Sequence, residues 1–313
     1  MKLRKWAGIL TAACCLVSGC QSAKTDPPKS EDPVKPAAVA EKVKPRRDLQ
    51  AVKQAIRQGE PCSLYFPDLE SGTVFTRAPR KMPSASMIKV FILAKAYAAM
   101  EQGTLRRDEV FTISRDNVVG GSGYLQGMAY GTRVSLSKVL HAMITASDNT
   151  ATNIMIDRLG MKAINDYMQT NGYKDSLLQR KMMDYDAIAA GRDNYTSVTD
   201  VGRLFERLGH GTCVNPEMDR EMLEIYKEQE DRDILPANLP SGTVVAHKTG
   251  EVNDVRHDGG IVYTPDGAYV LCIFSERYCP YRTMAAISED VYSAYRESGK
   301  SQPLAVVPKG EIK

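Results

Sequence analysis

The sequence predicts an α/β fold of the α+β kind, in which an antiparallel sheet built from both ends of the folded region is interrupted by a helical insertion. Runs rich in β-branched and aromatic residues, bounded by turn residues, occur near both ends and are typical of strands. The long stretch between them carries apolar residues at helical spacing instead. Because the strands at the two ends are expected to share one sheet, the helical stretch forms a subdomain inserted into it.

Five segments are expected to form the strands of this antiparallel sheet. Two of them make a hairpin around residues 69–72, and a second hairpin turns at residues 264–267, which include Pro and Gly. A fifth strand precedes the second hairpin. The predicted strands are residues 63–67, 73–76, 243–247, 260–263 and 268–274.

Helices are expected both beside the sheet and in the insertion. A helix over residues 48–58, closed by Gly59, and an amphipathic helix over residues 282–297 flank the sheet. The insertion contains further predicted helices over residues 86–102, 136–146, 150–159, 162–171 and 200–208. The sequence contains no internal repeat.

The composition is that of an ordinary globular protein. The chain has 313 residues, of which 43% are hydrophobic and 25% are charged. A net charge of +3 gives no strong field for nucleic acid, and no stretch interleaves basic and aromatic residues, so we expect no nucleic-acid binding. We also expect no metal and no other cofactor, because no His or Cys pair has zinc-ligand spacing and the histidines are scattered at His141, His210, His247 and His257.

The N-terminus has the features of an export signal. Lys2, Arg4 and Lys5 form a positive start, and residues 6–17 are mostly apolar but too few to span a bilayer. The small residues before Cys20 resemble a bacterial lipoprotein cleavage site, after which the cysteine is lipidated. The alternative is an ordinary signal peptide with an incidental cysteine. We therefore expect a signal peptide over residues 1–20 and an exported protein anchored to the membrane by lipid at Cys20.

The rest of the chain divides by composition. The segment after Cys20 is rich in Lys, Pro, Ala and Asp and has almost no large apolar residues, which indicates a flexible tether. The folded domain follows and ends before a short tail. The predicted boundaries are a tether over 21–47, a folded domain over 48–299 with its sheet part at 48–82 and 235–299 and its helical part at 83–234, and a tail over 300–313.

Four cysteines remain beyond Cys20. In an exported protein, Cys62, Cys213, Cys272 and Cys279 allow disulfides with three full pairings. The sequence does not choose among these pairings, and free buried cysteines are the alternative.

The first candidate for chemistry is Ser86-Met87-Ile88-Lys89, of the form S-x-x-K, at the start of a predicted helix. Residues three apart lie on one helical face, so the hydroxyl and the amine are expected to be neighbours. The helix is apolar nearly all round and therefore buried, and burial near the positive end of the helix dipole lowers the pKa of Lys89 and favours a neutral base. The pattern is weak by itself, because Ser135 and Lys138 also fit it; Ser135 is better explained as a helix N-cap.

Two further tripeptides become informative in combination. Ser147-Asp148-Asn149 is by itself good N-cap chemistry for the helix after it, and Lys248-Thr249-Gly250 is by itself a strand end followed by a turn glycine. Their order after S-x-x-K is specific: Ser147 lies 61 residues after Ser86, and Lys248 lies 101 residues after Ser147.

The order and spacing of S-x-x-K, S-D-N and K-T-G resemble those of the class A β-lactamases and their relatives among the penicillin-binding proteins. The resemblance covers roughly residues 48–297 and agrees with a sheet that carries an inserted helical subdomain. It implies a serine acyl-transfer enzyme whose active site lies at the junction of the two parts.

The resemblance also implies roles for the matching residues. Ser86 attacks the substrate carbonyl and becomes acylated, and Lys89 withdraws its proton. Ser147 relays a proton to the leaving nitrogen, and Asn149 orients the substrate and Lys89.

Binding of the substrate carboxylate falls, by the same resemblance, to Lys248 and Thr249, with Gly250 completing the segment. The backbone N–H groups of Ser86 and Glu251 would form the oxyanion hole. Arg256 is a further candidate for binding the carboxylate, and a surface charge is the equal alternative.

The sequence departs from the class A pattern in one place. Those enzymes carry an E-x-x-x-N segment about 36 residues after the start of S-D-N, and its glutamate activates the water that hydrolyses the acyl-enzyme. In this chain the count reaches Met183, and no glutamate occurs between Glu109 and Glu206. Asp184 or Asp186 could substitute, although an aspartate is one methylene shorter. The alternative is that both are solvated loop residues.

Three functions remain compatible with these residues. The first is a β-lactamase-like hydrolase, and the second is a D,D-peptidase or transpeptidase that acts on cell-wall peptides. The third is a penicillin-binding sensor that is acylated without turnover. The expected partners are a small-molecule β-lactam or a peptidoglycan peptide and, through Cys20, the membrane; we expect a monomer.

Overall fold

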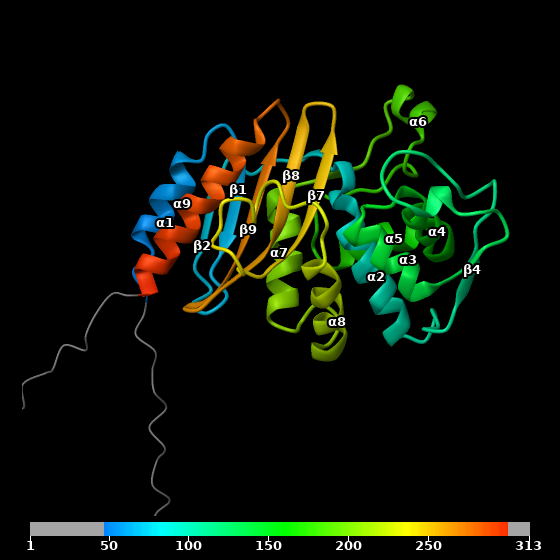
Figure 1. Cartoon of the computed structure of the whole chain (residues 1–313), viewed down its shortest axis with the longest axis horizontal. Coiled ribbons are helices and arrows are strands. Elements are labelled where there is room, and N and C mark those ends of the chain that lie inside the picture. Colours follow the sequence, from blue (N-terminus) through cyan, green and yellow to red (C-terminus); the bar gives the residue numbers. More distant parts are fainter. Residues whose placement is uncertain (1–46, 300–313) are drawn as a thin grey trace, which may run out of the picture. The chain divides into compact units, whose positions relative to one another are not determined.

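The computed structural model describes residues 47–299, which contain a five-stranded antiparallel sheet (Figure 1). The strands lie in the order β2-β1-β9-β8-β7, so the two ends of the described chain supply one sheet, as predicted. The strands are β1 (Ser63–Pro67), β2 (Val74–Arg77), β7 (Val245–Val252), β8 (Val255–Thr264) and β9 (Gly267–Ser275).

Helices cover both faces of this sheet. α1 (Gln50–Gln58) and α9 (Tyr281–Gly299) lie side by side on one face, and α7 (Val198–Gly209) lies on the other (Figure 1). Side chains alternate between the faces along a strand. In β1, Leu64 accordingly joins the core beneath α1 and α9, whereas Tyr65 joins the core on the α7 side. Because both faces are covered, β1 is buried along its whole length.

The helical part is built around α2 (Lys89–Glu101), which is buried over most of its length. The helix is apolar on nearly every side because other helices enclose it. These are α3 (Leu136–Thr145), α4 (Asn149–Leu159), α5 (Met161–Thr170) and α8 (Pro216–Lys227).

Smaller elements are η1 (Ala85–Ile88), η2 (Leu125–Gly127), α6 (Tyr185–Ala189), the pair β3 (Met82–Pro83) and β6 (Tyr195–Thr196), and the pair β4 (Val110–Thr112) and β5 (Arg133–Ser135).

Three predicted boundaries near the candidate residues were wrong. The strand expected over residues 260–263 begins earlier, at Val255 of β8, and so contains Arg256. The strand expected to end at residue 247 continues as β7 to Val252, because Lys248-Thr249-Gly250 pairs with β8 instead of forming a turn. The helix expected to start at Ser86 is preceded by the 3-10 turn η1, and α2 begins at Lys89.

Two helices were missed by the prediction, the short α6 and the longer α8. α8 begins with Pro216 and is capped by Asn215, whose side-chain oxygen accepts hydrogen bonds from the backbone N–H groups of Glu217 and Met218. Asparagine followed by proline is a typical start of a helix, so the signal was present in the sequence.

The predicted signal peptide with Cys20, nearly all of the predicted tether and the predicted tail lie outside the described residues. Between residues 47 and 299, no helix combines the length and the apolar character that crossing a membrane requires.

Candidate active site

Ser86 lies in η1, directly before α2, where the helical part meets the sheet. The preceding residue, Ala85, has a φ of 44°, a left-handed conformation that is strained for any residue but glycine and is often found at active sites. Strand β7 passes so close that a Cβ atom on Gly250 would lie 3.1 Å from the backbone nitrogen of Ser86. Glycine at this position therefore allows the strand to approach the predicted nucleophile.

An open cavity of about 240 Å³ lies against Ser86. Its lining includes Ser147, the segment 229–231 that follows α8, and the part of β7 from Thr249 to Glu251. The structure thus brings the S-x-x-K, S-D-N and K-T-G segments to one cavity. Within residues 47–299, no group of His, Cys, Asp or Glu side chains is arranged to hold a metal ion.

Lys89 is fully buried at the first position of α2. Its Nζ lies within hydrogen-bond distance of the carbonyl oxygen of Ser147 (2.6 Å), of Oγ of Ser147 (3.1 Å) and of Oδ1 of Asn149 (3.0 Å). Burial holds the pKa of Lys89 well below its ordinary value, and the nearby charge of Lys248 lowers it further, while Asp148 opposes both effects. The amine is therefore held in place and disposed to be neutral, as a base must be.

Ser147 lies in the turn between α3 and α4, with a φ of 51°. Asp148 fixes this turn, because its carboxylate accepts hydrogen bonds from the N–H of Ala151 at 2.8 Å and of Leu125 at 2.7 Å. The N-cap interpretation of the tripeptide is thus correct for Asp148. Ser147 and Asn149, on either side of the cap, both bind Lys89, so one turn serves the helix and the site.

Lys248 is fully buried on β7 and reaches the same hydroxyl from the sheet. Its Nζ donates to Oγ of Ser147 at 3.1 Å and to the carbonyl oxygen of Thr249 at 2.7 Å. Burial lowers the pKa of Lys248 to about 8, and the carboxylates of Asp231 and Asp258 limit the shift. Lys248 therefore remains largely protonated at neutral pH.

This constellation agrees with the comparison of the whole sequence with known families. The sequence profile of the β-lactamase enzyme family matches residues 44–295, which is most of the chain. The chain belongs to this family.

Individual members of the β-lactamase family resemble the chain at moderate identity. The β-lactamase of Streptomyces albus G is 26% identical over 236 residues, which cover 72% of this chain and 74% of that protein. β-Lactamase AER-1 of Aeromonas hydrophila is 27% identical over 188 residues, which cover 58% of this chain. The match spans only 62% of the length of AER-1.

Among solved structures, PBP-A is 30% identical to the chain and superposes with a TM-score of 0.71, over 80% of this chain and 96% of that one. A point mutant of PBP-A, solved as an acyl-enzyme complex with penicillin G, is also 30% identical and gives a TM-score of 0.72. The fold is therefore that of a β-lactamase-family protein.

By sequence spacing, Met183 falls where the class A enzymes are expected to carry the water-activating glutamate. A Cβ atom on Gly121 would lie 2.6 Å from Nδ2 of Asn149 and 3.1 Å from Sδ of Met183, so the amide and the thioether meet beside this glycine. Met183 therefore lies next to the side chain that binds Lys89, and it has a φ of 64°. A thioether cannot take a proton from water, so this site lacks the usual base.

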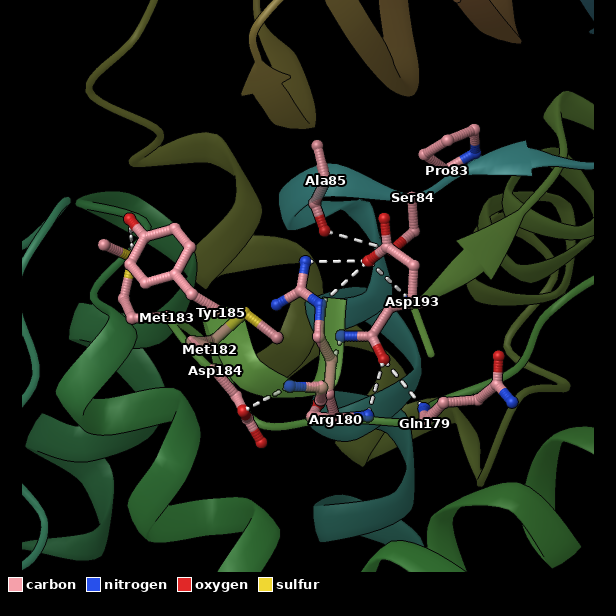
Figure 2. Close-up of polar contacts among 12 residues, drawn as sticks. Pro83, Ser84, Ala85, Gln179, Arg180, Met182, Met183, Asp184, Tyr185 and Asp193 are labelled. Carbon is pink, nitrogen blue, oxygen red and sulfur yellow. Dashed lines mark hydrogen bonds and ion pairs between the residues drawn. The ribbon is translucent and has the colours of Figure 1, made fainter. Parts of the chain in front are cut away.

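The two candidate substitutes do not fill this place. Asp184 caps α6, because its carboxylate accepts a hydrogen bond from the N–H of Ala187 at 2.9 Å, and Asp186 is exposed in the same short helix. Neither aspartate lines the cavity, and nor does Met183, but Met183 lies beside Asn149. Figure 2 shows Asp184 and Met183 in their loop. An ion pair of 2.8 Å between Arg180 and Asp193 joins the two ends of this loop.

Two buried asparagines, which the sequence analysis missed, hold this loop. Asn153 of α4 accepts a hydrogen bond from the N–H of Met182 at 2.8 Å and donates one to its carbonyl oxygen at 3.1 Å. The side-chain oxygen of Asn194 accepts a hydrogen bond from the N–H of Gln179 at 2.8 Å. The backbone carbonyl oxygen of Asn194 accepts a second hydrogen bond, from the N–H of Ser84, at 2.8 Å. The available signal was an asparagine on α4 one turn after S-D-N, because a polar residue on a buried helix face must find partners.

Arg256 holds one end of β7 and does not line the cavity. Its Nε donates to Oε1 of Glu251 at 3.0 Å, and its Nη1 donates to the carbonyl oxygen of Cys279 at 2.8 Å. The guanidinium also lies 4.8 Å from the ring centre of Tyr278 and 4.3 Å from that of Tyr281. These contacts engage Arg256 with protein groups, and its part in binding the substrate carboxylate stays a prediction.

Proposed function

We propose that the protein is a serine hydrolase that opens β-lactam rings through an acyl-enzyme on Ser86. The observation that carries the proposal is the buried amine of Lys89, held against the backbone and hydroxyl oxygens of Ser147 beside a cavity that Ser86 lines. Membership of the β-lactamase family supports the same activity.

Acylation needs a base, a proton donor and a place for negative charge. Oγ of Ser86 forms the new bond to the lactam carbonyl carbon, and its proton passes to the neutral amine of Lys89. The lactam C–N bond breaks, and the nitrogen receives a proton through the hydroxyl of Ser147, which both buried amines contact. The N–H groups of Ser86 and Glu251 stabilise the negative carbonyl oxygen.

Substrate binding rests on the K-T-G segment. The protonated amine of Lys248 attracts the substrate carboxylate, and Thr249 and Gly250 line the cavity where that carboxylate would lie. Asn149 orients the bound substrate, and it also keeps Lys89 in place through the 3.0 Å hydrogen bond.

Hydrolysis of the acyl-enzyme is the slow step of the proposed reaction. General acid–base catalysis contributes roughly 10²–10⁴-fold in rate, and Met183 offers no base next to Asn149 and Lys89. We therefore propose a rapid first acylation followed by slow release.

A D,D-peptidase or transpeptidase that acts on cell-wall peptides is the second candidate. Met183 favours it, because an acyl-enzyme that resists water persists until an amine acceptor attacks it. The likeness to PBP-A also favours a penicillin-binding protein. A sensor that is acylated without turnover is the limiting case of the same chemistry.

We also propose that the chain is exported, is anchored to the membrane by lipid on Cys20, and works as a monomer. The N-terminal residues carry the export and anchoring parts of this proposal: a basic start, a short apolar run and small residues before Cys20.

The decisive experiment mixes a chromogenic β-lactam with protein lacking residues 1–20 and follows colour and intact mass over time, with Ser86→Ala as the matched control. A burst of one equivalent, an adduct on Ser86 and continued slow turnover would support the hydrolase. A burst with no later turnover would replace it with the peptidase or the sensor. Absence of an adduct would overturn the assignment of Ser86.

A further inference from the structure

Two cysteines from opposite ends of the described chain meet in one core. Cys62 directly precedes β1, and Cys279 lies between β9 and α9, yet their sulfur atoms are 3.7 Å apart. Both side chains are fully buried in the core beneath α1 and α9, and both thiols are free. The separation of 217 residues makes this contact a product of the sheet topology.

We propose that Cys62 and Cys279 form a disulfide when the chain folds in a thiol-oxidising compartment. A disulfide has a sulfur–sulfur distance of about 2.05 Å, and rotation of the two side chains can close a gap between sulfur atoms already in contact. The two thiols lose two protons and two electrons as the S–S bond forms. A disulfide of a thiol oxidoreductase accepts them and becomes a dithiol. This inference rests on the proposed export, since disulfides persist in oxidising compartments.

The other two cysteines lie in the core on the α7 side of the sheet, apart from this pair. Sγ of Cys213 is 3.6 Å from the hydroxyl of Tyr167 in the helical part. Cys272 packs against Gly259 on the opposite face of the sheet from Cys62. Of the pairings that the sequence left open, the structure therefore assigns one bridge and leaves Cys213 and Cys272 as thiols.

The bridge would form as the protein folds. Both sulfur atoms are inaccessible in the folded state, and burial raises the pKa of Cys62 well above its ordinary value, with Cys279 adding to the shift. Only the thiolate exchanges with a disulfide, so the folded dithiol resists a late oxidant. Oxidation thus accompanies folding, before the core closes.

The bridge also reaches the wall of the active site. The carbonyl oxygen of Cys279 accepts the 2.8 Å hydrogen bond from Arg256, which in turn holds Glu251 at the cavity. A bond between Cys279 and Cys62 would therefore restrict the motion of the segment between β9 and α9, whose carbonyl oxygen binds Arg256.

The test refolds the full chain in mild detergent, with Cys14, Cys15 and Cys20 replaced by serine, in the presence or absence of glutathione disulfide. Oxidation by this reagent yields two glutathione molecules for each bridge. We expect peptides containing Cys62 and Cys279 to be joined in a non-reducing digest of the oxidised sample. We also expect a melting temperature about 5–10 °C above that of the reduced sample.

Matched variants complete the test. Cys62→Ser and, separately, Cys279→Ser should abolish both the joined peptide and the rise in melting temperature. The double variant Cys213→Ser, Cys272→Ser should keep both. Alkylation of both cysteines in the oxidised wild-type chain, or a different pair of joined peptides, would overturn the proposal. The digest does not depend on catalysis, so its failure is distinct from a failure of the proposed function.

Discussion

The amino groups of Lys89 and Lys248 both lie 3.1 Å from one hydroxyl oxygen, that of Ser147. Two buried ammonium groups this close disfavour each other's charge. Asp231 and Asp258 support the charge of Lys248, whose pKa is lowered to about 8, whereas burial and the charge of Lys248 hold the pKa of Lys89 well below its ordinary value. This arrangement fits the proposed roles of Lys89 as the base and Lys248 as the charged group that binds the substrate carboxylate.

Replacing the base should abolish acylation without unfolding the protein. Lys89→Met keeps an unbranched buried side chain and removes the amine, so we expect the acylation rate to fall by about 10²–10⁴-fold. Stopped-flow mixing with a chromogenic β-lactam measures the rate, and thermal melting monitors the fold. Lys95→Met, on the same helix, is the control and should acylate like the wild type. A fully active Lys89→Met would show that another group takes the proton.

Acylation should weaken at alkaline pH as Lys248 loses its charge. Its pKa is about 8, so the ammonium form that binds the substrate carboxylate predominates below that pH and is lost above it. We expect the second-order acylation constant to fall above about pH 8 for a β-lactam with a free carboxylate. A β-lactam with an esterified carboxylate should lack this decline. The same decline with both compounds would assign it to a different group.

A carboxylate in place of Met183 should speed release of the acyl group. Met183→Glu places a base beside Asn149 and Lys89, and we expect deacylation to accelerate by at least about 10²-fold. The lifetime of the adduct, followed by intact mass after a single-turnover mix, measures the change. Met183→Gln matches the shape without the base. Equal lifetimes in the two variants would show that the barrier to water lies elsewhere in the site.

The close approach of β7 to Ser86 should be sensitive to one methyl group. Gly250→Ala would place Cβ 3.1 Å from the backbone nitrogens of Ser86 and Met87, so the strand and η1 must move apart. Because small displacements of reacting groups lower the rate of the chemical step, we expect acylation to slow by about 10²-fold. Gly127→Ala is the control, since no other heavy atom lies within 4 Å of the added methyl group. Unchanged acylation in Gly250→Ala would mean that this approach is not part of the oxyanion site.

The sequence by itself determined the architecture and the three catalytic segments. Strand and helix periodicity are local properties, and the hairpin of β1 and β2 formed where turn residues separate two strand-like runs. Ser86, Ser147 and Lys248 were found by order and spacing, and the structure brings their segments to one cavity. Their individual tripeptides were ambiguous, because S-D-N is also a helix cap and here Asp148 does cap α4.

Only the tertiary structure decided how these residues act on one another. Asp184 and Asp186 were acceptable substitutes on sequence distance, but helix capping and exposure take them away from the cavity, and Met183 lies beside Asn149 instead. The contacts of Arg256 with Glu251 and Cys279 could not be read from the sequence. The contact between Cys62 and Cys279 depends on β1 lying next to β9. The cap that Asp184 forms on α6 is local. The surroundings of Met183, the contact of Arg256 with Cys279 and the cysteine pair instead depend on partners distant in sequence, whose distances and burial local patterns do not specify.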